Sequence, residues 1–156
     1  MSLVEHIIAG ERTSGESNNS APIYNPATGE QTGVVTLGGA EEINKAVAVA
    51  KEAFKSWSTT PAAKRARVMF KLRDILESRA DEVALTISKE HGKTHNDALG
   101  EVTRALEVVE YACGIAEKLK GDFSRDVGPG IDTCSERQPL GVVAGITPFN
   151  FPAMVP

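Results

Sequence analysis

The last sixteen residues constrain the fold of this chain more than any other segment. Gly141–Ile146 is an apolar run, and it leads into Thr147-Pro148-Phe149-Asn150-Phe151-Pro152. An apolar run without polar alternation is typical of a strand that is buried on both faces of a parallel sheet. Residues that precede proline favour extended backbone, so the two prolines stiffen the turn around Asn150. The pattern predicts a buried strand over 142–146 and places Asn150 just past its carboxyl end, where α/β sheets bind ligands.

Helical spacing of apolar residues predicts four helices in the middle of the chain. Thr60 and Pro61 are expected to cap and begin the second helix, and Gly92 is expected to end the third. The expected helices are 40–57, one that begins at Pro61, 80–91 and 97–119. Turn residues punctuate 1–39, which predicts short strands and loops there. Residues 122–130 are expected to form a turn-rich connection, and 133–138 a further strand.

Charge and composition exclude several functional classes. The 156 residues include 17 basic and 21 acidic side chains, for a net charge of −4, which does not favour binding to nucleic acid or to an anionic membrane. No apolar stretch approaches the roughly 20 residues that span a bilayer. The first residues lack the pattern of a secretory signal or a transit peptide. The two cysteines, Cys113 and Cys134, are expected to be free thiols of a cytoplasmic protein.

Three segments of the chain carry recognisable motifs. The motifs are Ile8-Ala9-Gly10-Glu11 with Asn25-Pro26-Ala27-Thr28-Gly29-Glu30, Glu90-His91-Gly92-Lys93-Thr94 with Ala98-Leu99-Gly100-Glu101, and Thr147-Pro148-Phe149-Asn150-Phe151-Pro152. Together they resemble the aldehyde dehydrogenase superfamily. Within the superfamily, the chain most resembles the CoA-acylating branch that acts on methylmalonate semialdehyde. The resemblance implies an α/β fold, with strands and loops over 1–39 and, over 40–156, helices and the first strand of a Rossmann-like sheet in an incomplete NAD-binding domain.

The resemblance also implies roles for individual residues. The amide of Asn150 would stabilise the oxyanion that forms when a cysteine attacks the aldehyde. Ile146, Thr147, Pro148 and Phe149 would contact the nicotinamide half of NAD, and Arg104 would bind a substrate carboxylate. CoA would be the co-substrate. Members of the family are much longer than this chain, so we expect an amino-terminal portion that is inactive alone and that belongs to a dimeric or tetrameric enzyme.

Simpler interpretations of the same residues remain open at this point. An Asn between prolines is also a common turn former. Arg104 has the helical spacing to form ion pairs with Glu101 and Glu107. Gly92-Lys93-Thr94 lacks the preceding glycine of a phosphate-binding loop, and we expect no metal site at His91 and His95.

Other side chains have structural interpretations. Cys113 falls on the apolar side of the fourth helix and is expected to be a core residue. The basic residues between Lys64 and Arg73 are expected to lie on a solvated helix face.

Three other functions compete with the semialdehyde dehydrogenase. The chain could be a non-catalytic interaction module or truncated subunit that associates with longer subunits. It could also be an independent helical domain, or part of another NAD(P)-dependent aldehyde dehydrogenase such as the succinate-semialdehyde type.

Overall fold

The computed structural model describes residues 2–156, and its first part is built from short strands. A three-stranded sheet has the order β1-β5-β4, in which β1 runs parallel to β5 and β4 runs antiparallel to it. A separate hairpin joins β2 and β3. The prediction of short strands over 1–39 is confirmed for the described residues. The strands are Ser2–Val4 (β1), His6–Ile8 (β2), Glu11–Thr13 (β3), Ser20–Tyr24 (β4) and Gln31–Thr36 (β5).

The helices follow the sequence pattern closely, with two corrections. They are Ala40–Trp57 (α1), Ala62–Ser78 (α2), Ala80–His91 (α3), His95–Cys113 (α4) and Ile115–Lys118 (α5). The predicted cap at Thr60 is wrong: Pro61 holds the capping position, and the Thr60 hydroxyl donates to the carbonyl oxygen of Ser56 at 3.0 Å.

The predicted helix over 97–119 is also wrong at both ends. The hydroxyl of Thr94 caps α4 by accepting the N–H of Asp97 at 3.3 Å, so the helix begins at His95. Gly114 then separates α4 from the short α5.

A carboxylate of α1 ties this helix to the strand region. Glu42 is 7% exposed, and its side chain accepts the backbone N–H groups of Glu16 at 2.6 Å, Gly39 at 2.6 Å and Ser17 at 3.3 Å. The bond to Gly39 satisfies the backbone N–H of the capping residue of α1, while Gly39 itself has no side chain that could cap the helix. The N–H groups of Glu16 and Gly39, in that order, lower the pKa of Glu42 from its usual 4.5 to about 2. The Gly15–Ser17 loop is therefore held against α1 by a charged side chain.

The most buried residues lie where α3 and α4 pack together. Ala84, Ala98 and Val102 are fully buried and Ile87 is 5% exposed. Alanines at the contact let the two helices approach closely. Gly92 ends α3 in the left-handed conformation (φ +84°), and a Cβ at this position would lie 3.0 Å from Cγ of Pro26. The stop signal expected at Gly92 is confirmed.

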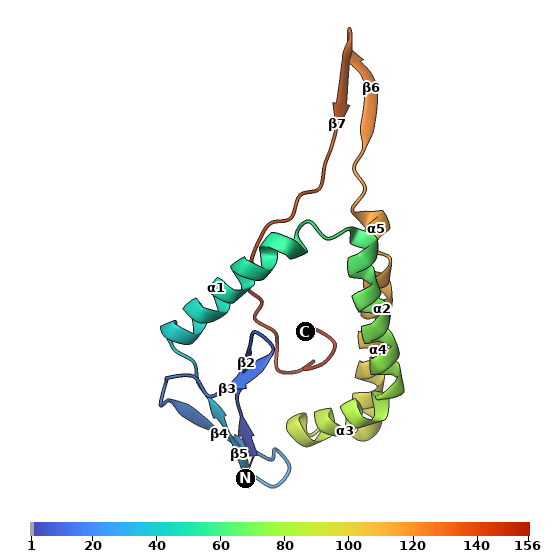
Figure 1. Cartoon of the computed structure of the whole chain (residues 1–156). Coiled ribbons are helices and arrows are strands. Elements are labelled where there is room, and N and C mark those ends of the chain that lie inside the picture. Colours follow the sequence, from blue (N-terminus) through green and yellow to red (C-terminus); the bar gives the residue numbers. More distant parts are fainter. Residues whose placement is uncertain (1) are drawn as a thin grey trace.

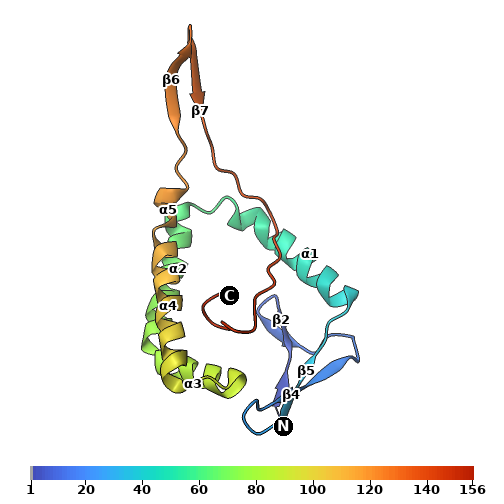
Figure 2. The same cartoon turned by 180° about the vertical axis from the view of Figure 1, so that it is seen from behind.

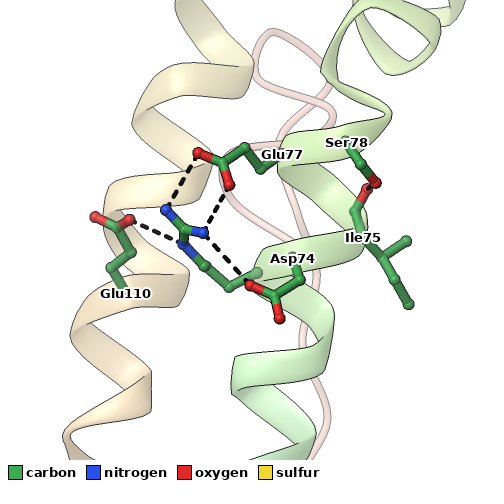
Figure 3. Close-up of polar contacts among 6 residues, drawn as sticks. Asp74, Ile75, Glu77, Ser78 and Glu110 are labelled. Atoms are coloured by element: carbon green, nitrogen blue, oxygen red, sulfur yellow. Dashed lines mark hydrogen bonds and ion pairs between the residues drawn. The ribbon is translucent and has the colours of Figure 1, made fainter.

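An ion-pair network joins α2 to α4 (Figure 3). The Arg73 guanidinium on α2 donates to Glu77 on the same helix at 2.6 Å and to Glu110 on α4 at 3.2 Å. Its side chain is 31% exposed. Arg73 is only partly exposed because acidic residues of two helices pair with it, whereas Lys64, Arg67 and Lys71 are exposed, as predicted for a solvated helix face.

Residues 123–134 form a long hairpin that projects away from the helices (Figure 1). Its strands are Phe123–Gly128 (β6) and Ile131–Cys134 (β7), which pair antiparallel. The prediction of a turn-rich connection over 122–130 is thus wrong for most of these residues, because 123–128 form a strand. The strand predicted over 133–138 shares only its first two residues with β7. The pairing is irregular between Ser124 and Gly128, and Asp126 has a φ of +53°. Nearly every residue of the hairpin is exposed, so no buried face requires an alternating pattern in its sequence.

The buried strand predicted over 142–146 is not formed. Val143 is 74% exposed and Ile146 is fully exposed, and no strand within residues 2–156 pairs with this segment. A parallel strand needs neighbours to satisfy its backbone N–H and C=O groups, and the described residues supply none here. The mixed α/β class is confirmed by the helices and small sheets, but the expected Rossmann-like strand is absent from the described part.

The strands and helices are arranged around the carboxyl-terminal segment, which runs between them (Figures 1 and 2). The accessible surface is 11607 Å², whereas a compact monomer of 16.6 kDa would expose roughly 7,600 Å². Large apolar side chains, among them Leu140, Ile146 and Phe149, contribute to this excess. None of the helices among the described residues is long and apolar enough to cross a membrane.

Candidate functional site

The segment singled out by the sequence is an exposed strip that ends in a compact turn. Ile146 is 101% exposed and Phe149 is 88% exposed, and Thr147, Pro148 and Asn150 are also exposed. The backbone turns at Asn150 and again at Pro152–Met154, where the N–H of Val155 donates to the carbonyl oxygen of Phe151 at 3.4 Å. The five predicted cofactor and oxyanion residues therefore form one continuous, accessible surface.

Two charged side chains attach this turn to the helices. Lys93 follows the end of α3, and its ammonium donates to the Asn150 carbonyl oxygen at 2.7 Å and to Oε2 of Glu101 at 2.6 Å. Oε1 of Glu101, on α4, accepts the backbone N–H groups of Ala153 at 2.8 Å and Met154 at 3.2 Å. The turn is thus bonded on both sides of Phe151.

The carboxylate of Glu101 is fully buried, which makes its bonds energetically important. Burial acts to raise its pKa, but the bonds from Lys93, Ala153 and Met154 outweigh burial and lower the pKa of Glu101 below its usual value. The side chain is therefore a buried anion that requires Lys93 as its counterion. The Lys93 ammonium also lies 4.6 Å from the centre of the Phe151 ring, a cation–π distance.

The side chain of Asn150 remains available to a ligand. Lys93 fixes its backbone carbonyl, but no hydrogen bond from residues 2–156 engages its exposed carboxamide. A carboxamide N–H on a turn held in place is suited to stabilise a developing negative charge on a bound molecule. This role for Asn150 stays a prediction.

Arg104 lies on α4, three residues after Glu101, and is exposed. The ion pairs with Glu101 and Glu107 that the helical spacing allowed are not formed, and Glu101 is paired with Lys93 instead. Within residues 2–156, no ion pair engages the Arg104 guanidinium. Glu101 is fully buried whereas Arg104 is exposed, so α4 holds the Asn150 turn through a buried side chain and presents Arg104 to solvent.

Several other candidates have structural roles. Nε2 of His95 lies 2.9 Å from a carboxylate oxygen of Asp81. His91 lines a shallow recess of about 540 Å³ with Glu90, Phe149 and Pro152. Cys113 is half-buried, Cys134 is exposed, and both are free thiols. No group of three or more His, Cys, Asp or Glu side chains in the described part could hold a metal ion.

Sequence reasoning missed the two residues that attach the turn. Both residues lie in a family motif, but the sequence suggests for Lys93 only a phosphate-binding loop, which is excluded, and for Glu101 only an ion pair with Arg104. A signal for Glu101 was present, because it shares the spacing of Ala98, Val102 and Ala105, all of which are buried. A carboxylate on the apolar face of an amphipathic helix needs a partner, and its sequence position does not reveal that partner.

Comparisons with known proteins agree on one family. The model of the aldehyde dehydrogenase family matches residues 13–156. The chain is 49% identical over its whole length to malonate-semialdehyde dehydrogenase from Pseudomonas aeruginosa, and it spans 31% of that protein. It is 44% identical over 98% of its length to the mitochondrial acylating methylmalonate-semialdehyde dehydrogenase of Arabidopsis thaliana, of which it spans 25%.

A solved structure shows the same arrangement. It is a putative methylmalonate-semialdehyde dehydrogenase from Sinorhizobium meliloti complexed with NAD, to which the chain is 45% identical with a TM-score of 0.94. The alignment covers 99% of this chain and 31% of that structure. The chain thus spans about a third or less of the length of these relatives.

Proposed function

Because the chain belongs to the aldehyde dehydrogenase family, we propose that it forms the amino-terminal part of an NAD-dependent semialdehyde dehydrogenase. The observation that carries this proposal is the state of Asn150. Its turn is held by Lys93 and Glu101, while no hydrogen bond from residues 2–156 engages its carboxamide. A polar side chain on a fixed turn is what a preorganised oxyanion site requires.

The proposed reaction is the oxidation of malonate or methylmalonate semialdehyde to an acyl-CoA through a cysteine thioester. Support for the substrate comes from the names of the relatives, and support for CoA comes from the acylating Arabidopsis relative. Attack of a thiolate on the aldehyde carbon places negative charge on the carbonyl oxygen. In our proposal the Asn150 carboxamide donates a hydrogen bond to that oxygen.

The exposed strip before Asn150 is the proposed contact surface for the nicotinamide half of NAD. Ile146 and Phe149 offer apolar surface, Thr147 offers a hydroxyl, and Pro148 stiffens the strip. These residues fit a flat, partly apolar ring, and the NAD complex of the Sinorhizobium relative supports the choice of cofactor. NAD supplies the hydride acceptor of the reaction.

Arg104 is the proposed binding residue for the carboxylate of the substrate. Its guanidinium has no anionic partner within residues 2–156, and it lies on the helix that also holds the Asn150 turn. A planar guanidinium can bind a carboxylate through two parallel hydrogen bonds. This arrangement would favour semialdehydes that carry an acid group over simple aldehydes.

Further parts of the proposal concern the whole protein. We propose that it is a cytoplasmic homo-oligomer, and that 1–39 and 40–156 belong to distinct structural parts of it. The large exposed apolar surface also supports the alternative of an interaction module, because such a surface is typical of interfaces. These two possibilities differ in whether a polypeptide containing this chain has dehydrogenase activity.

The test is turnover by the protein expressed from the complete reading frame. We expect NADH and an acyl-CoA to form from methylmalonate semialdehyde, CoA and NAD, with slower turnover of propanal. NADP replaces NAD in a parallel assay to establish the cofactor preference. The 156-residue chain alone should be inactive, since its two cysteines lie at the ends of α4 and β7 and not in the Asn150 turn. Absence of NADH formation by the complete protein would favour the interaction module.

A further inference from the structure

The turn that carries Asn150 lacks the support that the sequence predicted for it. No strand within residues 2–156 pairs with 142–146, so the backbone before Asn150 is not held by a sheet among the described residues. The bonds that hold this turn come instead from the side chains of Lys93 and Glu101. These two residues have no part in the chemistry proposed above.

The contacts bond the turn at Asn150 and again three to four residues after it. Lys93 binds the carbonyl oxygen of Asn150 itself, at 2.7 Å. Glu101 binds the N–H groups of Ala153 and Met154, at 2.8 and 3.2 Å. Ala153 additionally packs against the buried cluster of α3 and α4. The position and orientation of Asn150 therefore depend on two distant side chains. Lys93 lies 57 residues before Asn150 in the chain, and Glu101 lies 52 residues before Ala153.

The two side chains are coupled to each other. The Lys93 ammonium lies 2.6 Å from a carboxylate that is fully buried, and the Lys93 side chain is 15% exposed. Removal of one partner of a buried ion pair leaves the other charge uncompensated. Lys93 and Glu101 therefore act as a unit, and the loss of either releases both attachments of the turn.

We propose that Lys93 and Glu101 are positioning residues that hold the Asn150 carboxamide where it acts on the oxyanion. This inference rests on the proposed function of Asn150. A purely structural ion pair would stabilise the fold without any special link to Asn150. A positioning role differs in one respect: Lys93 raises kcat only when the Asn150 carboxamide is present.

The experiment is a double-mutant cycle in the complete protein, with Lys93→Met, Asn150→Ala and the combined variant. Misplacement of a reacting group by about 1 Å can lower a rate on the order of 10²-fold, so we expect Lys93→Met to lower kcat roughly 10- to 100-fold. The KM for NAD should change by less than about threefold, and Lys93→Arg should restore part of kcat because it retains the charge. In the Asn150→Ala background, Lys93→Met should lower kcat by less than about threefold.

Lys89→Met provides a matched control. Lys89 is exposed on α3, one turn before Lys93, and makes no ion pair within residues 2–156. Its substitution should leave kcat unchanged. Glu101→Gln serves as the second variant on the other partner, and thermal unfolding of every variant verifies that it is folded.

A second readout does not depend on activity. Amide hydrogen exchange at Ala153 and Met154 should accelerate in Lys93→Met and in Glu101→Gln, but not in Lys89→Met. Equal kcat losses from Lys93→Met in the wild-type and Asn150→Ala backgrounds would overturn the positioning role, as would unchanged exchange at these amides. A wild-type rate in Asn150→Ala would instead overturn the proposed function, while the exchange data would still report on the attachment of the turn.

Discussion

Replacement of Asn150 by alanine should lower the catalytic rate while it leaves the stability of the fold nearly unchanged. The carboxamide has no hydrogen-bond partner among residues 2–156, and the bond from Lys93 goes to the Asn150 backbone carbonyl, which alanine retains. The bonds of Glu101 to Ala153 and Met154 are also retained. A substitution at such an exposed position changes the free energy of unfolding by no more than about 0.5 kcal/mol.

The expected loss is therefore a loss of transition-state stabilisation. Removal of one oxyanion donor costs about 2.7–4 kcal/mol, which corresponds to a 10²- to 10³-fold lower rate. Asn150→Ala in the complete protein should lower the single-turnover rate of hydride transfer by that factor. NAD affinity should change by less than about threefold, because the proposed cofactor contacts come from Ile146–Phe149 and not from the carboxamide.

The assay combines rapid mixing with a cofactor titration. NADH absorbance after mixing enzyme, NAD and semialdehyde reports the chemical step, and binding of NAD is titrated separately for each variant. Asn150→Asp should be at least as slow as Asn150→Ala, since a carboxylate offers no N–H donor and repels an oxyanion. Asn96→Ala, at an exposed position in the first turn of α4, is the matched control. A wild-type rate for Asn150→Ala would refute the oxyanion role and leave Asn150 as a turn former.

Three further predictions concern other parts of the chain. Arg104→Leu should lower kcat/KM for methylmalonate semialdehyde about 10- to 100-fold, as expected for a charge-assisted bidentate contact, and the value for propanal by much less; equal losses would indicate a structural arginine. The pKa of Glu42 in the folded protein, about 2, lies below its usual 4.5. The Glu42 carboxylate therefore stabilises the Gly15–Ser17 loop fully above about pH 4.5, and this stabilisation is lost as the pH falls towards 2. Nuclear magnetic resonance titration of the Glu16 and Gly39 amides should show this transition, and Glu42→Gln should abolish it; amides that do not respond to pH would contradict it. Val102 is fully buried, so Val102→Ala should destabilise the α3–α4 pair by about 1.5–3 kcal/mol. Denaturant unfolding or hydrogen exchange measures this change, and an unchanged free energy of unfolding would show that the contact is loosely packed.

Local signals in the sequence were sufficient for α1 and α3. The apolar spacing predicted 40–57 and 80–91 with the observed bounds, because the signals that end these helices lie within a few residues of them, as Gly92 does for α3. The same reasoning failed at the ends of α4, where the Thr94 cap and the break at Gly114 were not recognised. It failed again at β6, where nearly all residues are exposed and no buried face imposes an alternating pattern.

The amino-acid sequence by itself determined the family motifs, the helical segments and the identity of Asn150 as the candidate oxyanion donor. Only the tertiary structure decided how the Asn150 turn is held. The apolar run over 142–146 predicted a buried strand, but burial and pairing depend on neighbouring strands, and residues 2–156 provide none at this place. Lys93 and Glu101 belong to a family motif, but the sequence does not show which groups they bind. Their function as the attachment of the turn arises because folding brings a buried carboxylate to N–H groups 52 and 53 residues further along the chain.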